Sequence, residues 1–347
     1  MTTASTAAYP ERLARRSLFV VWGPPSHGPR SKVFARALGI DLLFVHGTKR
    51  RGLLIAPWKY GYQAIATLLL LMRRRPHIVF VQSPPSLAVL FVWLYAAVTG
   101  RRFVVDAHSG ALDTRYWTRP AWLHRFLTRR TTLTIVTGEH FADQIEARGG
   151  QALILRDIPT SFAAGAPPAL EERFRVLAVN TFAPDEPVDL IVSAAAQLPD
   201  IGFYITGDLN RPGVTLPPTI PRNVHFTGYV PDDVYYGLME ASQAVMCLTT
   251  RDHTMQRGAC EALSLGRPII TSDWPLLRTY FSKGAVFVDA DADAIRRGVE
   301  EMVFHHDRYC AEIRALQTEQ RQQSNAAFSE LIAVLDQPVR RRRQPHG

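Results

Sequence analysis

Short apolar runs alternate with helical stretches along almost the whole chain, and this alternation constrains the fold more than any other feature. The runs SLFVVW (17–22), HIVFVQ (77–82) and GFYIT (202–206) are rich in β-branched and aromatic residues. Continuous runs of this kind are typical of parallel strands whose two faces are both covered by crossover helices. The sequence therefore predicts an α/β protein built on doubly wound parallel sheets.

The alternation occurs in two successive sets, which predict two domains. The first set predicts an N-terminal domain over 1–158, and the second predicts a C-terminal domain over 173–336 that ends in a long helix. Residues 159–172 are rich in Pro, Ala and Gly and are interpreted as a linker, and 337–347 as a flexible basic tail. We expect strands at 17–22, 42–46, 77–82, 102–106, 133–137, 152–155, 175–179, 202–206, 224–227, 244–248, 268–271 and 285–288.

Composition excludes several classes of protein. The 347 residues contain only three cysteines, which are far apart and form no CxxC motif, so a disulfide scaffold or a zinc ribbon is not expected. The longest apolar runs, 64–72 and 87–98, are short for the ~20 residues that cross a bilayer. Arg15-Arg16 is followed by too short an apolar stretch for an export signal. We therefore expect a cytoplasmic protein.

Charge is distributed unevenly between the two halves. Residues 1–170 carry a net charge of +14 and residues 171–347 a net charge of −5, which suggests different partners for the halves. The clusters Arg73–Arg75 and Arg340–Arg343 occur without a helix-turn-helix, RNP or zinc motif, so we expect no nucleic acid. Peripheral contact with an anionic membrane at the inner face fits these clusters better, and a solvated charge run is the alternative.

Two segments of the second half carry a resemblance to a known family. They are NVHFTGYV at 223–230 and GACEALSLGRPIITSD at 258–273. The second has the arrangement Glu-Ala, then Gly-x-Pro, then Asp, and both resemble the C-terminal domain of GT-B glycosyltransferases of family 4. In the first half, the turn GPPSHG at 23–28 and the segment DAH at 106–108 are similar to the N-terminal domain of that family.

The resemblance implies a GT-B fold with two Rossmann-like domains that face each other across a cleft. It also implies an enzyme that moves a sugar from a nucleotide-diphosphate sugar to an acceptor, without a metal or a bound cofactor. The acceptor is expected to be a lipid-linked saccharide of cell-envelope or exopolysaccharide synthesis. A non-catalytic nucleotide-sugar-binding or scaffold subunit and a nucleotide-sugar epimerase are the alternatives.

The resemblance places the donor on the helix that carries Glu261. Glu261 is expected to bind the ribose hydroxyls, and a solvated helix charge is the alternative. The family's Arg/Lys pair for the diphosphate is missing, and Arg257, at the start of the same helix, is our first candidate to replace it, with a surface charge as the alternative. Arg251, Arg278, Arg30 and Lys32 are the other candidates. A helix N-terminus also favours phosphate. Further donor contacts are expected from Thr181, Gly228 and Tyr229.

Three histidines are further candidates for the site. His253 stands eight residues before Glu261, where the family has a second glutamate, and is a catalytic candidate or a loop histidine. His108 follows a strand and could take a proton from an acceptor if transfer inverts the anomeric centre. It binds sugar or phosphate if transfer retains that centre, and a structural histidine is the alternative. Ser26 and His27 are candidates for acceptor binding, and Gly28 for close approach to the donor, with an ordinary turn as the alternative.

The segment Asp289-Ala-Asp291-Ala-Asp293 looks like a metal-binding DxD motif. It precedes a helical stretch through Phe304, where aspartates satisfy free N–H groups and the helix dipole. We therefore expect Asp291 or Asp293 to cap that helix. No other group of His, Cys, Asp or Glu has the spacing of metal ligands, so we expect no metal site.

Overall fold

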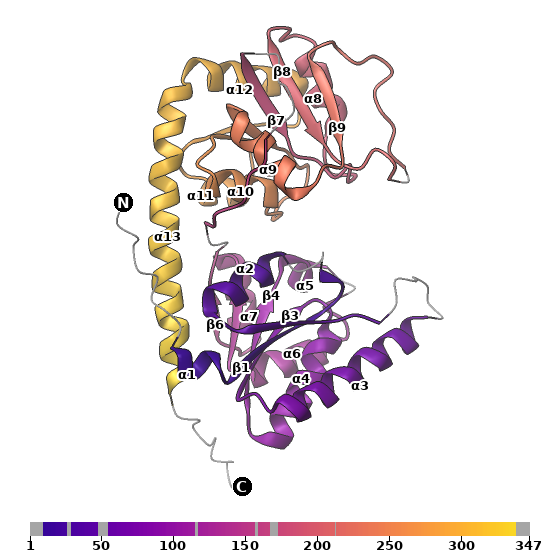
Figure 1. Ribbon diagram of the computed structural model, residues 1–347, viewed down its shortest axis with the longest axis vertical. Coiled ribbons are helices and arrows are strands. Elements are labelled where there is room, and N and C mark those ends of the chain that lie inside the picture. The colour runs from indigo at the N-terminus through magenta and orange to yellow at the C-terminus, as the bar shows by residue number, and fades with distance from the viewer. Residues whose placement is uncertain are drawn as a thin grey trace. The chain divides into compact units, whose positions relative to one another are not determined.

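The computed structural model describes residues 10–25, 29–47, 55–114, 117–156, 159–166, 173–211 and 213–337. The chain divides into two compact units (Figure 1). The first comprises residues 1–158 together with 322–347, and the second comprises residues 159–321. Each unit is built on one six-stranded parallel sheet, as the alternation of apolar runs predicts.

The first unit has the strand order β2-β1-β3-β4-β5-β6. All neighbouring strands are parallel, and Val20 of β1 pairs with Leu43 of β2 on one side and with Val81 of β3 on the other. The strand sequences are continuous apolar runs because both sides of the sheet are covered by helices. The strands are β1 (Ser17–Trp22), β2 (Asp41–Val45), β3 (Ile78–Ser83), β4 (Arg102–Ala107), β5 (Leu133–Val136) and β6 (Ala152–Ile154).

Two groups of helices bury the two faces of this sheet. Side chains on one face, Phe19 and Phe80 among them, form a core with Phe34 of α2 and Leu331 of the last helix. On the other face, Val20 and Val81 contribute to a core with residues of the remaining larger helices. The helices of this unit are α1 (Glu11–Ala14), α2 (Pro29–Leu38), α3 (Ala56–Arg74), α4 (Ser86–Thr99), α5 (Ser109–Asp113), α6 (Ala121–Arg130) and α7 (Glu139–Ala147).

The second unit repeats this plan with the strand order β12-β11-β10-β7-β8-β9. One face packs on α8 and α12, and the other packs on α9, α10, α11 and the start of α13. The strands are β7 (Phe174–Ala178), β8 (Ile201–Thr206), β9 (Val224–Gly228), β10 (Ala244–Cys247), β11 (Ile269–Ser272) and β12 (Ala285–Val288). The helices are α8 (Val188–Ala195), α9 (Asp232–Ala241), α10 (Arg257–Ser264), α11 (Pro275–Tyr280), α12 (Ala292–Phe304) and α13 (His306–Asp336).

The long helix α13 departs from the predicted domain boundary. Its first part places Ile313 and Leu316 in a core of the second unit. Its last part places Phe328 and Leu335 in the core of the first unit, where the Phe328 ring stacks on Phe34 at 5.6 Å. Residues 322–336, which we expected in the C-terminal domain, are therefore grouped with the first unit, because their apolar face is buried there.

Three short helices were missed by the sequence analysis: α1, α5 and α11. Each has six residues or fewer, which is too short to show a helical period. Residues 167–172 of the expected linker and 338–347 of the expected tail lie outside the described residues. Within the described part of the chain, no helix is both long and apolar enough to cross a membrane.

Candidate functional site

The carboxyl ends of β7 and β10 form the most favourable place for a ligand in the second unit. The two strands are neighbours in the sheet, but the chain leaves β7 toward β8 on one side and β10 toward β11 on the other. The loops that follow them therefore diverge, and ligands of open α/β sheets bind where this happens. A Cβ added to Gly258 would lie 2.7 Å from Cγ1 of Val179, so α10 begins in close contact with the end of β7.

The acidic segment after β7 connects these two loops. The Thr249 hydroxyl donates to Oδ2 of Asp185 at 2.8 Å, and the Thr250 N–H donates to the Asp185 carbonyl at 2.8 Å. The Glu186 carboxylate accepts from the N–H groups of Thr181 and Ala183, at 2.8 and 2.9 Å. These two acids therefore fix the conformation of the loops that follow β7 and β10.

Thr181, predicted to contact the donor, lies in the loop after β7. Its hydroxyl is 3.2 Å from both carboxylate oxygens of Glu186, and its carbonyl accepts from Nη1 of Arg211 at 2.6 Å. Arg211 thus brings a cation to this edge of the sheet, beside the loop that carries Thr181. The sequence analysis did not select Arg211, because its position depends on how the long loop after β8 folds.

The N-terminus of α10 follows β10 at the same carboxyl edge of the sheet. The residue at its N-cap position is Gln256, whose side chain accepts no hydrogen bond from the described N–H groups at the start of the helix. Instead, its Nε2 donates to the Leu248 carbonyl at 2.7 Å, while its Oε1 is buried without a hydrogen-bond partner among the described groups. The first N–H groups of α10 are therefore available to an anionic ligand, as at other helix N-termini.

Glu261 lies one turn into α10 and is buried among hydrogen-bond donors. Its Oε1 accepts from Nε of Arg257 at 2.5 Å and from the Tyr236 hydroxyl at 3.2 Å. Its Oε2 accepts from the Tyr235 hydroxyl at 2.8 Å. A carboxylate offers about four acceptor positions, and three are occupied here by described residues. The alternative of a solvated helix charge is thus wrong, and one acceptor position remains for a ligand hydroxyl.

The two tyrosines come from α9 and were not found by the sequence analysis, since nothing in the sequence links them to a glutamate on a different helix. Burial and the neighbouring Glu261 raise the pKa of Tyr236 to about 12, and they raise the pKa of Tyr235 well above its usual value. Both hydroxyls therefore stay protonated at neutral pH and donate to the carboxylate. The Tyr236 ring stacks on Phe162 at 4.1 Å.

Arg257, the predicted diphosphate residue, is brought together with Glu261. Burial would lower the pKa of its guanidinium, but the Glu261 carboxylate outweighs this and raises it, so the side chain stays cationic. About half of the Arg257 side chain remains exposed. The guanidinium can therefore hold Glu261 in place and still meet a ligand.

His253 lies in the exposed loop between β10 and α10. Its φ is +54°, in the left-handed region that side chains seldom adopt. Its N–H donates to Oδ1 of Asp252 at 2.6 Å, and its Nε2 lies 3.5 Å from Oδ2 of the same residue. A catalytic role for His253 stays a prediction.

Gly228 and Tyr229 lie at the end of β9, two strands from β7. Gly228 has a φ of +69°, and its carbonyl accepts from the Gly207 N–H at 3.2 Å. Tyr229 is largely exposed to solvent. Both residues share the carboxyl edge of the sheet with the loop that carries Thr181, and their contact with a donor stays a prediction.

In the first unit, His108 follows β4 directly and is placed beside a buried acid. Its Nε2 lies 3.4 Å from Oδ2 of Asp106, whose side chain is fully buried. Nε of Arg30, on α2, lies 3.3 Å from Oδ1 of the same carboxylate, and another nitrogen of Arg30 donates to the Leu155 carbonyl at 2.7 Å. Burial would raise the pKa of Asp106, but Arg30 and His108 together lower it to about 2.

Asp106 is therefore ionised at neutral pH and pairs with Arg30, whereas its Oδ2 and Nε2 of His108 are close but make no hydrogen bond with each other. Ser26, His27 and Gly28, the other candidates of this unit, lie outside the described residues.

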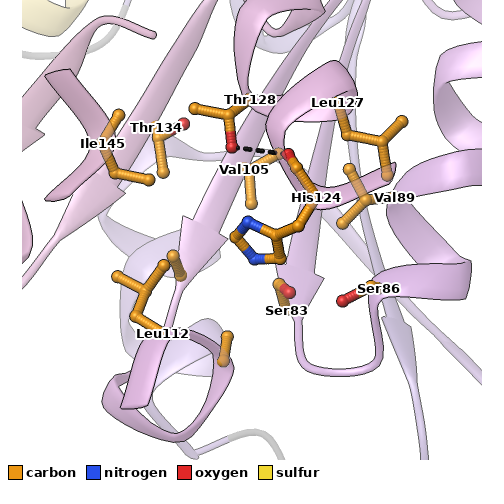
Figure 2. A pocket seen from close by; sticks show the side chains of 12 residues that line it. Ser83, Ser86, Val89, Val105, Leu112, His124, Leu127, Thr128, Thr134 and Ile145 are labelled. Carbon is orange, nitrogen blue, oxygen red and sulfur yellow. Dashed lines mark hydrogen bonds between the residues drawn. The ribbon is translucent and has the colours of Figure 1, made fainter. Parts of the chain in front are cut away.

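The first unit also encloses a cavity of about 30 Å³, whose lining includes Ser83 and Ala107 at the ends of β3 and β4. The His124 ring lies against it, and the Thr128 hydroxyl donates to the His124 carbonyl at 2.9 Å (Figure 2). Burial and Arg148 lower the pKa of His124 to about 4, so the ring is neutral at pH 7. The cavity has room for one or two water molecules, which is too little for a sugar.

The DxD-like segment caps a helix, as predicted. Asp291 is the N-cap of α12, and its Oδ2 accepts from the Ala294 N–H at 2.9 Å. Among the described residues, no group of three or more His, Cys, Asp or Glu side chains is placed to hold a metal ion.

Family models match both halves of the chain. Residues 4–159 match the model described as "Glycosyl transferase 4-like domain", and residues 173–303 match the model described as "Glycosyl transferases group 1". The chain belongs to the group 1 glycosyltransferases. This assignment confirms the family that the segments at 223–230 and 258–273 indicated. Comparison with curated proteins found no significant match.

Solved structures confirm the GT-B fold of this group 1 glycosyltransferase. HepE of Anabaena, in complex with UDP and glucose, has a TM-score of 0.64 at 12% identity, covering 92% of this chain and 99% of that one. Sucrose-phosphate synthase of Thermosynechococcus elongatus has a TM-score of 0.63 at 14% identity, with coverages of 92% and 97%. A putative UDP-N-acetylglucosamine 2-epimerase of Listeria monocytogenes has a TM-score of 0.62 at 8% identity, with coverages of 92% and 97%.

Proposed function

We propose that this glycosyltransferase moves a sugar from a nucleotide-diphosphate sugar to the hydroxyl of an acceptor, with the donor bound at the switch point between β7 and β10. The observation that carries the proposal is the buried Glu261 carboxylate, which three donors hold at the N-terminal part of α10. Its remaining acceptor position suits a ribose hydroxyl. The HepE structures with UDP and with UDP-glucose support a UDP-sugar as the first donor to test.

In this proposal the leaving diphosphate is stabilised by the chain alone. The free N–H groups of α10 and the positive end of its dipole meet the phosphates. Arg257 adds a charge at the same helix terminus, and Arg211 adds a second one from the loop after β8. Donors of this kind, fixed before the reaction, are effective because they need no reorganisation as charge develops on the leaving group.

On the acceptor side, His108 takes the proton of the attacking hydroxyl if transfer inverts the anomeric centre. Asp106 then stabilises the imidazolium that forms, which is the role of an acid placed behind a catalytic histidine. If transfer retains the centre, His108 binds the sugar or a phosphate. The proposed acceptor is a lipid-linked saccharide of envelope or exopolysaccharide synthesis, which suits the basic composition of the first half.

The test combines nucleotide binding with product analysis. The protein is incubated with UDP- and GDP-sugars, and both the dissociation constant and the slow release of nucleotide diphosphate are measured. Glu261→Gln should weaken nucleotide binding about 10- to 100-fold, the cost of a hydrogen bond to a charged group. Glu330→Gln, an exposed position on α13, is the matched control and should change neither quantity.

Other outcomes would identify the alternatives. A product that is an epimer of the donor sugar would indicate an epimerase, and tight nucleotide binding without turnover on any acceptor would indicate a scaffold subunit. Wild-type affinity in a correctly folded Glu261→Gln variant would refute the proposed donor site.

A further inference from the structure

Helix α3 exposes a row of large apolar side chains, while its buried side combines polar residues with small and aliphatic ones. Five large hydrophobic side chains on it follow each other at intervals of four, three, four and three residues, so they form a single stripe along the helix. All five are more than half exposed, from 51% for Met72 to 84% for Trp58. We call this set the α3 stripe, and its members are Trp58, Tyr62, Ile65, Leu69 and Met72.

The opposite side of α3 explains this orientation. Its buried residues include Gln63 and Thr67, and both are used in hydrogen bonds. Gln63 Nε2 donates to the Val45 carbonyl at 2.8 Å, and Nε1 of Trp22 donates to the Thr67 hydroxyl at 2.8 Å. These contacts fix the rotation of the helix about its axis. The α3 stripe is therefore held outward by the fold and does not result from a loosely packed helix.

Neighbouring helices extend the exposed apolar surface. α4 packs against α3, and α6 packs against α4, all on one face of the first sheet. α4 exposes Leu94 and Val98, and α6 exposes Trp122. Eight of the thirteen exposed large hydrophobic side chains among the described residues lie on these three helices, so they are concentrated and not scattered. Such concentrations mark interaction sites.

The same segment of the chain is strongly cationic. Residues 41–136, from the start of β2 to the end of β5, contain 14 Lys and Arg residues and three acids, Asp41, Asp106 and Asp113. Nη1 of Arg74 lies 3.3 Å from Oδ2 of Asp41, so the other basic residues of the segment carry most of its net charge. None of the three helices contains an acid, and α3 ends at Arg73 and Arg74, with Arg75 as its C-cap. On α6, Trp122 lines a surface hollow of about 400 Å³ together with Arg125, Arg129 and Arg130.

We propose that the α3 stripe docks this protein onto an anionic lipid bilayer. The apolar side chains enter the boundary between headgroups and acyl chains, and the surrounding arginines meet lipid phosphates. A stripe with Trp and Tyr beside Arg is typical of helices that lie in a membrane interface. A second copy of this chain fits this surface poorly, because the basic side chains of one copy would face those of the other. This inference does not depend on the proposed sugar transfer.

Vesicle co-sedimentation of the full chain tests the proposal. Vesicles of phosphatidylcholine alone are compared with vesicles that also contain phosphatidylglycerol, at low and high salt. We expect binding to the anionic vesicles, weaker in high salt. Each arginine near such a surface contributes about fivefold to partitioning, so replacing Arg73, Arg74 and Arg75 with Gln should weaken binding about 100-fold.

The apolar stripe is tested by the double variant Ile65→Ser and Leu69→Ser, for which we expect a loss of tenfold or more. Phe304→Ser changes a comparably exposed side chain of the second unit and should leave vesicle binding intact. The matched control for charge consists of Gln substitutions in the second unit at Arg222, Arg297 and Arg321. Circular dichroism and thermal midpoints confirm that each variant folds.

Three results would overturn the proposal. The first is no binding to anionic vesicles by the wild type. The second is binding that the α3 stripe variant leaves unchanged. The third is a concentration-dependent dimer that the stripe variant dissociates, measured by light scattering without vesicles, which would assign the surface to a second copy of the chain.

Discussion

Removing the charge of Asp106 should destabilise the first unit by about 2 kcal/mol, the free energy that corresponds to its change in pKa on folding. The side chain is fully buried and lies beside Arg30 and His108. Its pKa is lowered from 3.8 to about 2 in the folded protein. Because each tenfold change in proton affinity corresponds to about 1.4 kcal/mol, the folded state gains about 2 kcal/mol from the ionised carboxylate at neutral pH. Asp106→Asn keeps the shape and removes that gain.

The pH dependence follows from the direction of the change in pKa. The pKa of Asp106 is lower in the folded protein, so its contribution is fully present above the unfolded pKa of 3.8. The contribution is lost as pH falls through the folded pKa of about 2. The difference in free energy of unfolding between wild type and Asp106→Asn should therefore be near its full value at pH 5 and should shrink as pH falls toward 2. Other carboxylates titrate equally in both proteins and cancel.

Urea unfolding followed by tryptophan fluorescence is a suitable assay. Five of the six tryptophans lie in residues 1–158, so the signal reports mainly on the first unit. Asp143→Asn, at an exposed position on α7, is the control and should change stability by no more than about 0.5 kcal/mol, as surface substitutions usually do. A loss for Asp106→Asn at pH 7 that stays within this surface range of about 0.5 kcal/mol would refute the reasoning. A difference between the two proteins that does not shrink in acid would refute it as well.

Three further substitutions test the second unit. Gly258→Ala places a Cβ 2.7 Å from Val179 and should lower the free energy of unfolding by about 1–3 kcal/mol, measured by thermal unfolding with and without nucleotide. Asp291→Ala removes the cap of α12 and should cost about 1 kcal/mol in chemical denaturation, with wild-type nucleotide affinity. Tyr236→Phe removes one donor to Glu261 and should weaken nucleotide binding severalfold in calorimetry; an unchanged dissociation constant would show that Tyr236 does not position Glu261.

The sequence alone determined the two-sheet architecture and much of the donor site. Twelve predicted strands occur within a residue or two of their expected bounds, because a continuous apolar run between turn residues is a local signal. The helix cap at Asp291 could also be predicted from the local sequence, because the side chain of an aspartate just before a helix reaches an N–H group of the first turn. Glu261 was identifiable because its helix and the Gly-x-Pro turn after it form one continuous segment.

Only the tertiary structure decided which distant side chains meet. The tyrosines that hold Glu261 come from another helix, and Arg30 reaches Asp106 across 76 positions of the chain. Likewise, the sequence contains an apolar run at 64–72, but only the fold decides that Ile65, Leu69 and Met72 face outward while Gln63 and Thr67 are hydrogen-bonded inside. The last turns of α13 join the first unit because Phe328 and Leu335 find an apolar core there. Periodicity reports on neighbours along one helix or strand, whereas burial and charge pairing depend on chain segments that only the folded sheet brings together.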